Sequence, residues 1–196
     1  MLGLGASLLS PYVEGVAPYS NSYSLSLVTD TQTGGGDSFN TNQTLQSMYR
    51  DTFSASFWIK PDDGRKPNTN HVFGNGTVGT SFLFSINSNG YLGVFMLVNG
   101  KYIIGSTTTG QYDDGAASDF SHVVIVVKKN TGGNTAVKIY KDGAVLTMAP
   151  FSNVTDTDQA GIDFGGATTH IGWGNASDTS SNRLIGNIDE AAFFDT

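Results

Sequence analysis

Trp173 stands immediately before a polar loop, a placement suited to ligand binding. The loop carries Asn175 and Asp178. An exposed indole can stack on the apolar face of a sugar or anchor a protein partner, while amide and carboxylate groups bind hydroxyls. We therefore take these three residues, together with Tyr102, as candidate ligand-binding residues. We expect Tyr112 and the Asp113-Asp114 turn on the same surface. The alternative is that Trp173 covers one end of the fold and binds nothing.

Glycoside hydrolysis is the catalytic chemistry that acidic residues could support, and their spacing argues against it. It needs two carboxylates facing one substrate, about 5 Å apart in retaining enzymes. Asp189 and Glu190 form the only acidic pair within an expected strand, and Glu14 lies far upstream. Adjacent strand residues point to opposite faces, so this pair cannot share a substrate. We expect Asp189 to bind nearby backbone, Glu190 to face solvent or a sheet edge, and the protein not to be an enzyme.

The three histidines, His71, His122 and His170, fall on separate expected strands. A histidine-rich zinc site would require them to converge, which no sequence feature indicates. We expect His122 to be a half-buried packing residue. No serine stands in a nucleophile-elbow context, so the sequence gives no support for Ser-His-Asp catalysis.

Aspartates in glycine-rich loops could hold calcium, which takes hard oxygen ligands in flexible geometry. The stretch 29–42 contains Asp30, and a later acidic cluster contains Asp163. These two residues are the candidate metal ligands. The alternative is that such aspartates form Asx turns.

The charge of the chain excludes some partners. It has 17 acidic and 10 basic residues, a net charge of −7, and the basic residues are scattered. Binding to a phosphate backbone requires clustered Lys and Arg, so we expect no nucleic-acid partner. The absence of cysteine excludes disulfides and thiolate metal sites. No apolar run reaches the roughly 18 residues of a membrane span, so we expect no membrane partner.

Short β-strands must position all of these residues. Alternating or wholly apolar runs bounded by turn residues recur along the chain, and helix-favouring Glu is nearly absent. About a dozen strands and no helix are predicted. Three dipeptides predict hairpins, since they tolerate the positive φ angles of a type I′ turn: Asn89-Gly90, Asn99-Gly100 and Asp142-Gly143.

Some segments carry more specific expectations. In the strong strand 53–60, Trp58 is predicted to lie in the core. The strand 123–128 is apolar throughout, so it should be covered on both faces. The stretch 29–42 reads as a polar connection. Residues 1–20 are expected to form an extended N-terminal arm, and residues 21–196 the folded domain.

Several phrases in chain order resemble the laminin-G-like domains of the concanavalin A-like lectin/glucanase superfamily. They occupy 23–28, 53–61, 121–124, 137–145 and 186–195, and Phe120 stands where that family usually has Trp. The resemblance implies an all-β, two-sheet antiparallel jelly-roll β-sandwich. It also favours calcium at the rim of the sandwich. Members bind glycans, proteins or nothing known, so the fold alone does not assign a function.

The opening Met-Leu-Gly-Leu-Gly with an early Ser-Leu-Leu is similar to the start of structural proteins of tailed bacteriophages. This similarity implies a non-enzymatic virion structural protein, a capsid decoration or tail-associated protein that adheres to surface glycans. Its N-terminal arm would dock to other virion proteins within a homo-oligomer or symmetric assembly. The alternative is a free, extracellular carbohydrate-binding lectin module that depends on calcium.

Overall fold

In a computed structural model of the protein, the described residues are 25–27, 39–44, 52–65, 69–75, 82–98, 101–128, 137–150, 162–163, 168–172 and 183–195. Within these residues the chain forms thirteen strands and no helix. Accordingly, no helix in this part of the chain is long and apolar enough to cross a membrane.

The strands are short and are separated by turns and loops. They are β1 (Leu25–Leu27), β2 (Phe39–Thr44), β3 (Thr52–Pro61), β4 (Asn70–Gly74), β5 (Leu83–Ile86), β6 (Leu92–Val98), β7 (Lys101–Ser106), β8 (Ser121–Lys128), β9 (Val137–Lys141), β10 (Ala144–Val145), β11 (Ile162–Asp163), β12 (Thr168–Ile171) and β13 (Gly186–Asp195).

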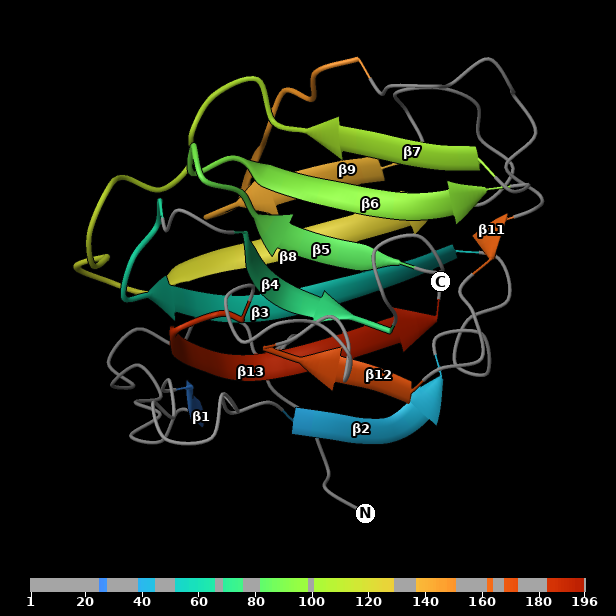
Figure 1. The fold of residues 1–196 in the computed structure, drawn as a ribbon, viewed down its shortest axis with the longest axis horizontal. Coiled ribbons are helices and arrows are strands. Elements are labelled where there is room, and N and C mark those ends of the chain that lie inside the picture. The colour runs from blue at the N-terminus through green and yellow to red at the C-terminus, as the bar shows by residue number, and fades with distance from the viewer. Residues whose placement is uncertain are drawn as a thin grey trace, which may run out of the picture.

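Two antiparallel sheets stack one over the other (Figure 1). The six-stranded sheet has the order β1-β13-β3-β8-β9-β10, and the seven-stranded sheet has the order β11-β6-β5-β4-β12-β2, with β7 paired to β6. Strands β1 and β13 pair through Leu25 and Ile188, which brings the start and the end of the described chain together. The predicted fold class, an all-β two-sheet antiparallel jelly-roll sandwich, is confirmed.

A cluster of aromatic rings holds the two sheets together. The ring centroid of Phe73, on β4, lies 5.1 Å from that of Phe57, 5.4 Å from that of Phe82, 5.8 Å from that of Phe84 and 5.4 Å from that of Phe193. Phe57 and Phe193 belong to the six-stranded sheet, so the cluster crosses the interface. Burial of each side chain of this size contributes roughly 1.5–3 kcal/mol.

Strand alternation corrects two predictions about burial. Ala55, Phe57 and Ile59 point into the core, so Trp58 points outward and is 38% exposed. The prediction that Trp58 is a core residue is therefore wrong, because the inward positions of β3 belong to its neighbours. On β8, likewise, every second side chain is buried and those between are half-buried. The prediction that this strand is covered on both faces is also wrong.

Hairpins occur as predicted, although one of them has a different turn. Asp142 and Gly143 have φ angles of 51° and 82°, as a type I′ turn requires. In the β5–β6 hairpin only Gly90 has a positive φ, 74°. The Asn87 carbonyl accepts the Gly90 N–H at 2.8 Å, and the Asn87 side-chain oxygen accepts the Asn89 N–H at 2.9 Å. Type I′ geometry at Asn89-Gly90 is therefore wrong, because Asn87 closes a different turn. Strands β6 and β7 also pair as a hairpin, but the turn between them lies outside the described residues.

Two strands, β2 and β11, were not predicted. β2 lies partly within the stretch expected to be a polar connection, and it is mostly exposed because it forms the edge of the seven-stranded sheet beside β12. β4 carries His71, which was expected on a strand, and it is buried along its whole length, so it shows no alternation. β11 is only two residues long. The predicted N-terminal arm, residues 1–20, lies outside the described residues.

Candidate functional site

Most of the predicted ligand and metal residues lie outside the described part of the chain. These are Trp173, Asn175, Asp178 and Asp30. The backbone does place Tyr102 on β7 and Asp163 on β11, and both pair with Leu97 of β6, from opposite sides. The structure therefore brings two candidates from different predicted sites to the same strand. Ligand binding by these residues stays a prediction.

The histidines do not gather into one site in the described structure. His71 and His170 lie on the paired strands β4 and β12, whereas His122 lies on β8 in the other sheet. Burial lowers the pKa of His170. Within the described ranges no three His, Cys, Asp or Glu side chains are placed to hold a metal ion. His122 is half-buried against Trp58, so its predicted packing role is confirmed.

A hollow of about 440 Å³ opens where β8 begins, and we call it the rim hollow. Residues 111–121 line most of it, Gly64 closes one side, and Lys141 and Asp142 close another. Phe120 lines it with a partly exposed ring. The hollow thus combines one aromatic surface with several hydrogen-bonding groups.

Loop 107–120 is held in place by backbone hydrogen bonds to the β5–β6 hairpin, to the end of β3 and to the segment that follows β3. The Gly90 carbonyl accepts the N–H groups of Gln111 at 2.7 Å and Tyr112 at 3.3 Å. The Gly115 carbonyl accepts the Gly64 N–H at 3.0 Å, and the Pro61 carbonyl accepts the Ala117 N–H at 2.9 Å. These contacts join segments far apart in the sequence, so the shape of the hollow depends on several segments that meet at this end of the sandwich.

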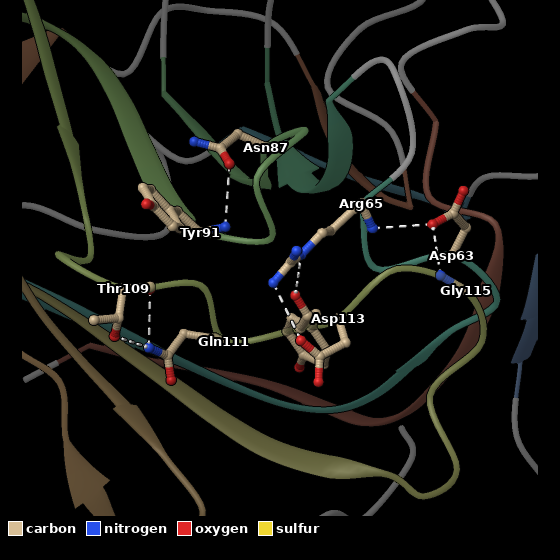
Figure 2. Close-up of polar contacts among 9 residues, drawn as sticks. Asp63, Arg65, Asn87, Tyr91, Thr109, Gln111, Asp113 and Gly115 are labelled. Atoms are coloured by element: carbon tan, nitrogen blue, oxygen red, sulfur yellow. Dashed lines mark hydrogen bonds and ion pairs between the residues drawn. The ribbon is translucent and has the colours of Figure 1, made fainter.

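Side chains add a second set of bonds to the same loop (Figure 2). Arg65 donates through Nε to the Tyr112 carbonyl at 3.2 Å and through Nη2 to the Asp113 carboxylate at 3.1 Å. The Asp63 carboxylate accepts the N–H groups of Arg65 at 3.0 Å and Gly115 at 3.3 Å. Arg65 is therefore already engaged by this loop, and its role is to hold the loop.

Tyr112 forms one wall of the rim hollow and is only 6% exposed. Lys141 Nζ lies 5.2 Å from the centre of its ring, a cation–π contact. Burial raises the pKa of Tyr112 well above its ordinary value, and Asp142 raises it further, although the Ser121 hydroxyl acts in the opposite direction. The phenol therefore stays protonated at neutral pH. The expectation that Tyr112 is a surface residue beside Tyr102 is not met, because the ring is buried.

The charge of the hollow is strongly acidic. Among the described residues its lining has one ammonium group, that of Lys141, which lies 3.5 Å from the Asp142 carboxylate, and Arg65 pairs with Asp113 from outside the lining. Four carboxylates line it: Asp113, Asp114, Asp119 and Asp142. Such a site repels anionic ligands and suits neutral ones whose hydroxyls donate to carboxylate oxygens.

Ser56 and His122 form a hydrogen-bonded pair that superficially suggests a nucleophile and its base. Ser56 Oγ lies 2.8 Å from His122 Nε2 on the outward face of the six-stranded sheet. A nucleophile also needs a third group that orients the base and donors for the oxyanion. Here the imidazole packs on Trp58, and β3 pairs with neighbouring strands on both sides, which occupies its backbone N–H groups. The pair therefore serves to fix the ring of His122.

The acidic pair Asp189–Glu190 lies at a bulge in β13 and not in a regular strand. Glu190 is exposed, as predicted, and has a φ of 46°. The Asp189 carboxylate accepts the Glu190 N–H at 2.8 Å, so it binds nearby backbone, as predicted. The bulge removes the simple alternation on which the argument against a shared substrate relied. The local hydrogen bond nevertheless assigns Asp189 a part in shaping the bulge.

The closed pair of antiparallel sheets places the protein in the class of jelly-roll β-sandwich proteins. Residues 33–196 match the family described as the concanavalin A-like lectin/glucanases superfamily, in its laminin-G-like branch. The chain belongs to this superfamily, which confirms the family resemblance. No curated protein sequence matches the chain.

Two solved structures with TM-scores above 0.5 share the fold at low sequence identity. The CBM40 of the Ruminococcus gnavus IT-sialidase, bound to α2,6 sialyllactose, is 14% identical with a TM-score of 0.53, and 88% of each chain is covered. The receptor binding domain of botulinum neurotoxin C/D mosaic serotype is 17% identical with a TM-score of 0.52, covering 87% of this chain and 41% of that one. A heptameric SAP-like pentraxin from Limulus polyphemus is 21% identical with a TM-score of 0.47, covering 74% of this chain. The chain spans 63% of that pentraxin.

Sequence reasoning placed Tyr112 and the Asp113-Asp114 turn on a candidate binding surface, and these residues line the rim hollow. It did not find the rest of the hollow, because the residues there follow no period. Loop 107–120 contains neither a strand pattern nor a known motif. One available signal was Phe120, which stands immediately before a strand of the family resemblance and adjoins the polar residues Ser118 and Asp119.

Proposed function

We propose that the protein is a non-enzymatic carbohydrate-binding module that holds a neutral glycan in the rim hollow. The observation that carries the proposal is an exposed aromatic ring beside hydroxyl-binding groups in one hollow. Phe120 offers an apolar face for a pyranose ring, and Asp119, Lys141 and Asp142 offer partners for its hydroxyls. Membership in a superfamily of lectins and glucanases, and the shared fold with a sialyllactose-bound CBM40, support carbohydrate as the ligand class.

A neutral ligand follows from the electrostatics of the hollow. A sialylated glycan would place another carboxylate among four of them, and among the described residues the cations beside the hollow, Arg65 and Lys141, are already paired with Asp113 and Asp142. Two like charges 4 Å apart near a protein surface repel by about 4 kcal/mol. We therefore expect this module to differ from the CBM40 neighbour by rejecting acidic sugars.

A glycan array followed by calorimetry tests the proposal. We expect binding to neutral glycans and none to their sialylated counterparts. Phe120→Ala should weaken binding by roughly fivefold to tenfold, since an aromatic contact contributes about 1 kcal/mol. Phe39→Ala is the matched control, because Phe39 is also exposed but lies on the edge strand β2, outside the rim hollow. Selective binding of sialylated glycans, or equal affinity of Phe120→Ala and the parent protein, would contradict the proposal.

The virion role is not part of this proposal, because it depends on residues 1–20, outside the described residues. Docking of the N-terminal arm to other virion proteins, homo-oligomeric assembly, and a virion or extracellular location stay predictions. The carbohydrate-binding role is compatible with each of them.

A further inference from the structure

Trp58 is an exposed aromatic residue close to the rim hollow but outside it. It lies on β3, which pairs on one side with β13 and on the other with β8. The direct partners of Trp58 on these strands are Asp189 and His122. The indole therefore stands on the outward face of the six-stranded sheet, near the strand end where the hollow opens.

The His122 ring that packs on Trp58 is fixed in place. The centres of the two rings lie 4.9 Å apart with an angle of 32° between their planes. Ser56 binds His122 Nε2 at 2.8 Å, and the Asp142 carboxylate accepts the backbone N–H of His122, also at 2.8 Å. A fixed aromatic surface loses little conformational entropy when it binds, which favours affinity.

The surroundings of Trp58 suit a sugar better than a protein partner. Its direct neighbours on the same face are polar, namely Ser56 and Lys60 along β3 and Asp189 and His122 across the adjacent strands, and the apolar Val124 and Ala192 lie one step farther, opposite Ser56. Protein docking sites bury a contiguous apolar centre, whereas a sugar offers one apolar ring face bordered by hydroxyls. A single indole with four polar side chains directly beside it matches the sugar.

The surface formed by Trp58 and His122 adjoins the rim hollow along the chain. Phe120 and Ser121 line the hollow, and the next residue, His122, packs on Trp58. Two strand residues cover roughly 7 Å, and the step from one strand to the next adds about 5 Å. Asp142 joins the two surfaces, since it lines the hollow and binds His122.

We propose that Trp58 is a second sugar subsite and that the ligand is an oligosaccharide chain running from the rim hollow onto the outward face of β3. This inference rests on the proposed carbohydrate-binding function. It adds that the protein recognises a chain of several sugar units, and not a terminal monosaccharide alone.

Length dependence of binding tests the inference. Calorimetry would use neutral gluco- and manno-oligosaccharides from two to six units, with different linkages. In the parent protein, affinity should rise about tenfold or more from the shortest to the longest ligand, because a second subsite acts at high effective concentration. Trp58→Ala should reduce this gain to less than about twofold while leaving disaccharide affinity unchanged, and Trp58→Phe should retain most of the gain.

The outcomes separate the two proposals. Phe194→Ala is the matched control, since Phe194 is 40% exposed and lies opposite Ser54, farther along β3. Loss of disaccharide binding in Phe120→Ala with no length dependence in the parent would support the hollow and overturn the Trp58 subsite. No binding of any neutral oligosaccharide would overturn both. The indole N–H resonance of Trp58, assigned with Trp58→Phe, provides a test in the unmodified protein: it should shift with hexasaccharide and not with disaccharide, and no shift with either would refute the subsite.

Discussion

Gly90→Ala should destabilise the fold far more than an ordinary glycine substitution. Gly90 has a φ of 74°, where an L-residue costs roughly 1–2 kcal/mol. A Cβ at this position would also overlap the carbonyl oxygen of Tyr112. Loop 107–120 would have to move away. This movement would break the hydrogen bonds that the N–H groups of Gln111 and Tyr112 donate to the Gly90 carbonyl, which contribute about 1 kcal/mol each. We therefore expect a total loss of about 3–4 kcal/mol.

Gly143→Ala provides the matched control, because it measures the cost of the positive φ angle without the steric overlap. Gly143 has a φ of 82°, and a Cβ there would meet no atom within 4 Å. Its substitution should cost only about 1–2 kcal/mol. Urea denaturation of both variants, extrapolated linearly to water, gives the two free energies of unfolding. If the two variants lose the same stability, the β5–β6 hairpin does not hold loop 107–120, and the account of the rim hollow is wrong. A folded Gly90→Ala protein should also have lost glycan affinity.

Two further predictions concern pH and calcium. In the unfolded state Tyr112 ionises near pH 10, whereas burial raises the pKa of its phenol in the folded state. The stability that the protonated phenol contributes is therefore complete below pH 10 and is lost as the pH rises above it. At pH 11 the lost stability is about 1.4 kcal/mol. Tyr112→Phe should remove that part of the alkaline destabilisation, measured by urea titrations at each pH. Equal pH profiles for the two proteins would contradict the buried position of the phenol. If calcium binds through Asp30 and Asp163, a saturated site contributes about 2.7 kcal/mol, so a chelator should lower the melting temperature by roughly 5–10 °C. Added calcium should restore it and magnesium should not, and a melting temperature unmoved by the chelator would remove the calcium site.

The sheets were predictable because their signals are local. Phe57 and Ile59 occupy alternate positions along β3, and Asp142-Gly143 encodes its own turn, so neither signal depends on distant contacts. The same alternation could have placed Trp58 correctly. Trp58 lies an even number of residues from Ser54, Ser56 and Lys60, so it falls on the same face of the strand as these polar residues. The prediction gave more weight to the hydrophobicity of Trp58 than to its position.

The rim hollow was not predictable, because its shape depends on hydrogen bonds between residues distant in the sequence. Asp63 binds Gly115, and Gly90 binds Gln111, and neither contact leaves a pattern in the sequence. The Asn89-Gly90 turn illustrates the same point at short range. The side chain of Asn87 determined the turn, and dipeptide preference alone did not include it.

The candidate binding surface combines side chains on paired strands, whose positions are fixed, with side chains on a loop, whose sequence can vary. Trp58 and His122 lie on paired strands whose inward neighbours are buried, so their positions change little when a ligand binds. Phe120 lies in a loop, whose length and sequence can vary without disturbing the core. Asp142 connects the two parts, because it forms the β9–β10 turn, binds the backbone of His122 and lines the hollow. In the proposed binding mode, the fold fixes the direction in which a sugar chain leaves the hollow, while the loop determines which sugar enters it.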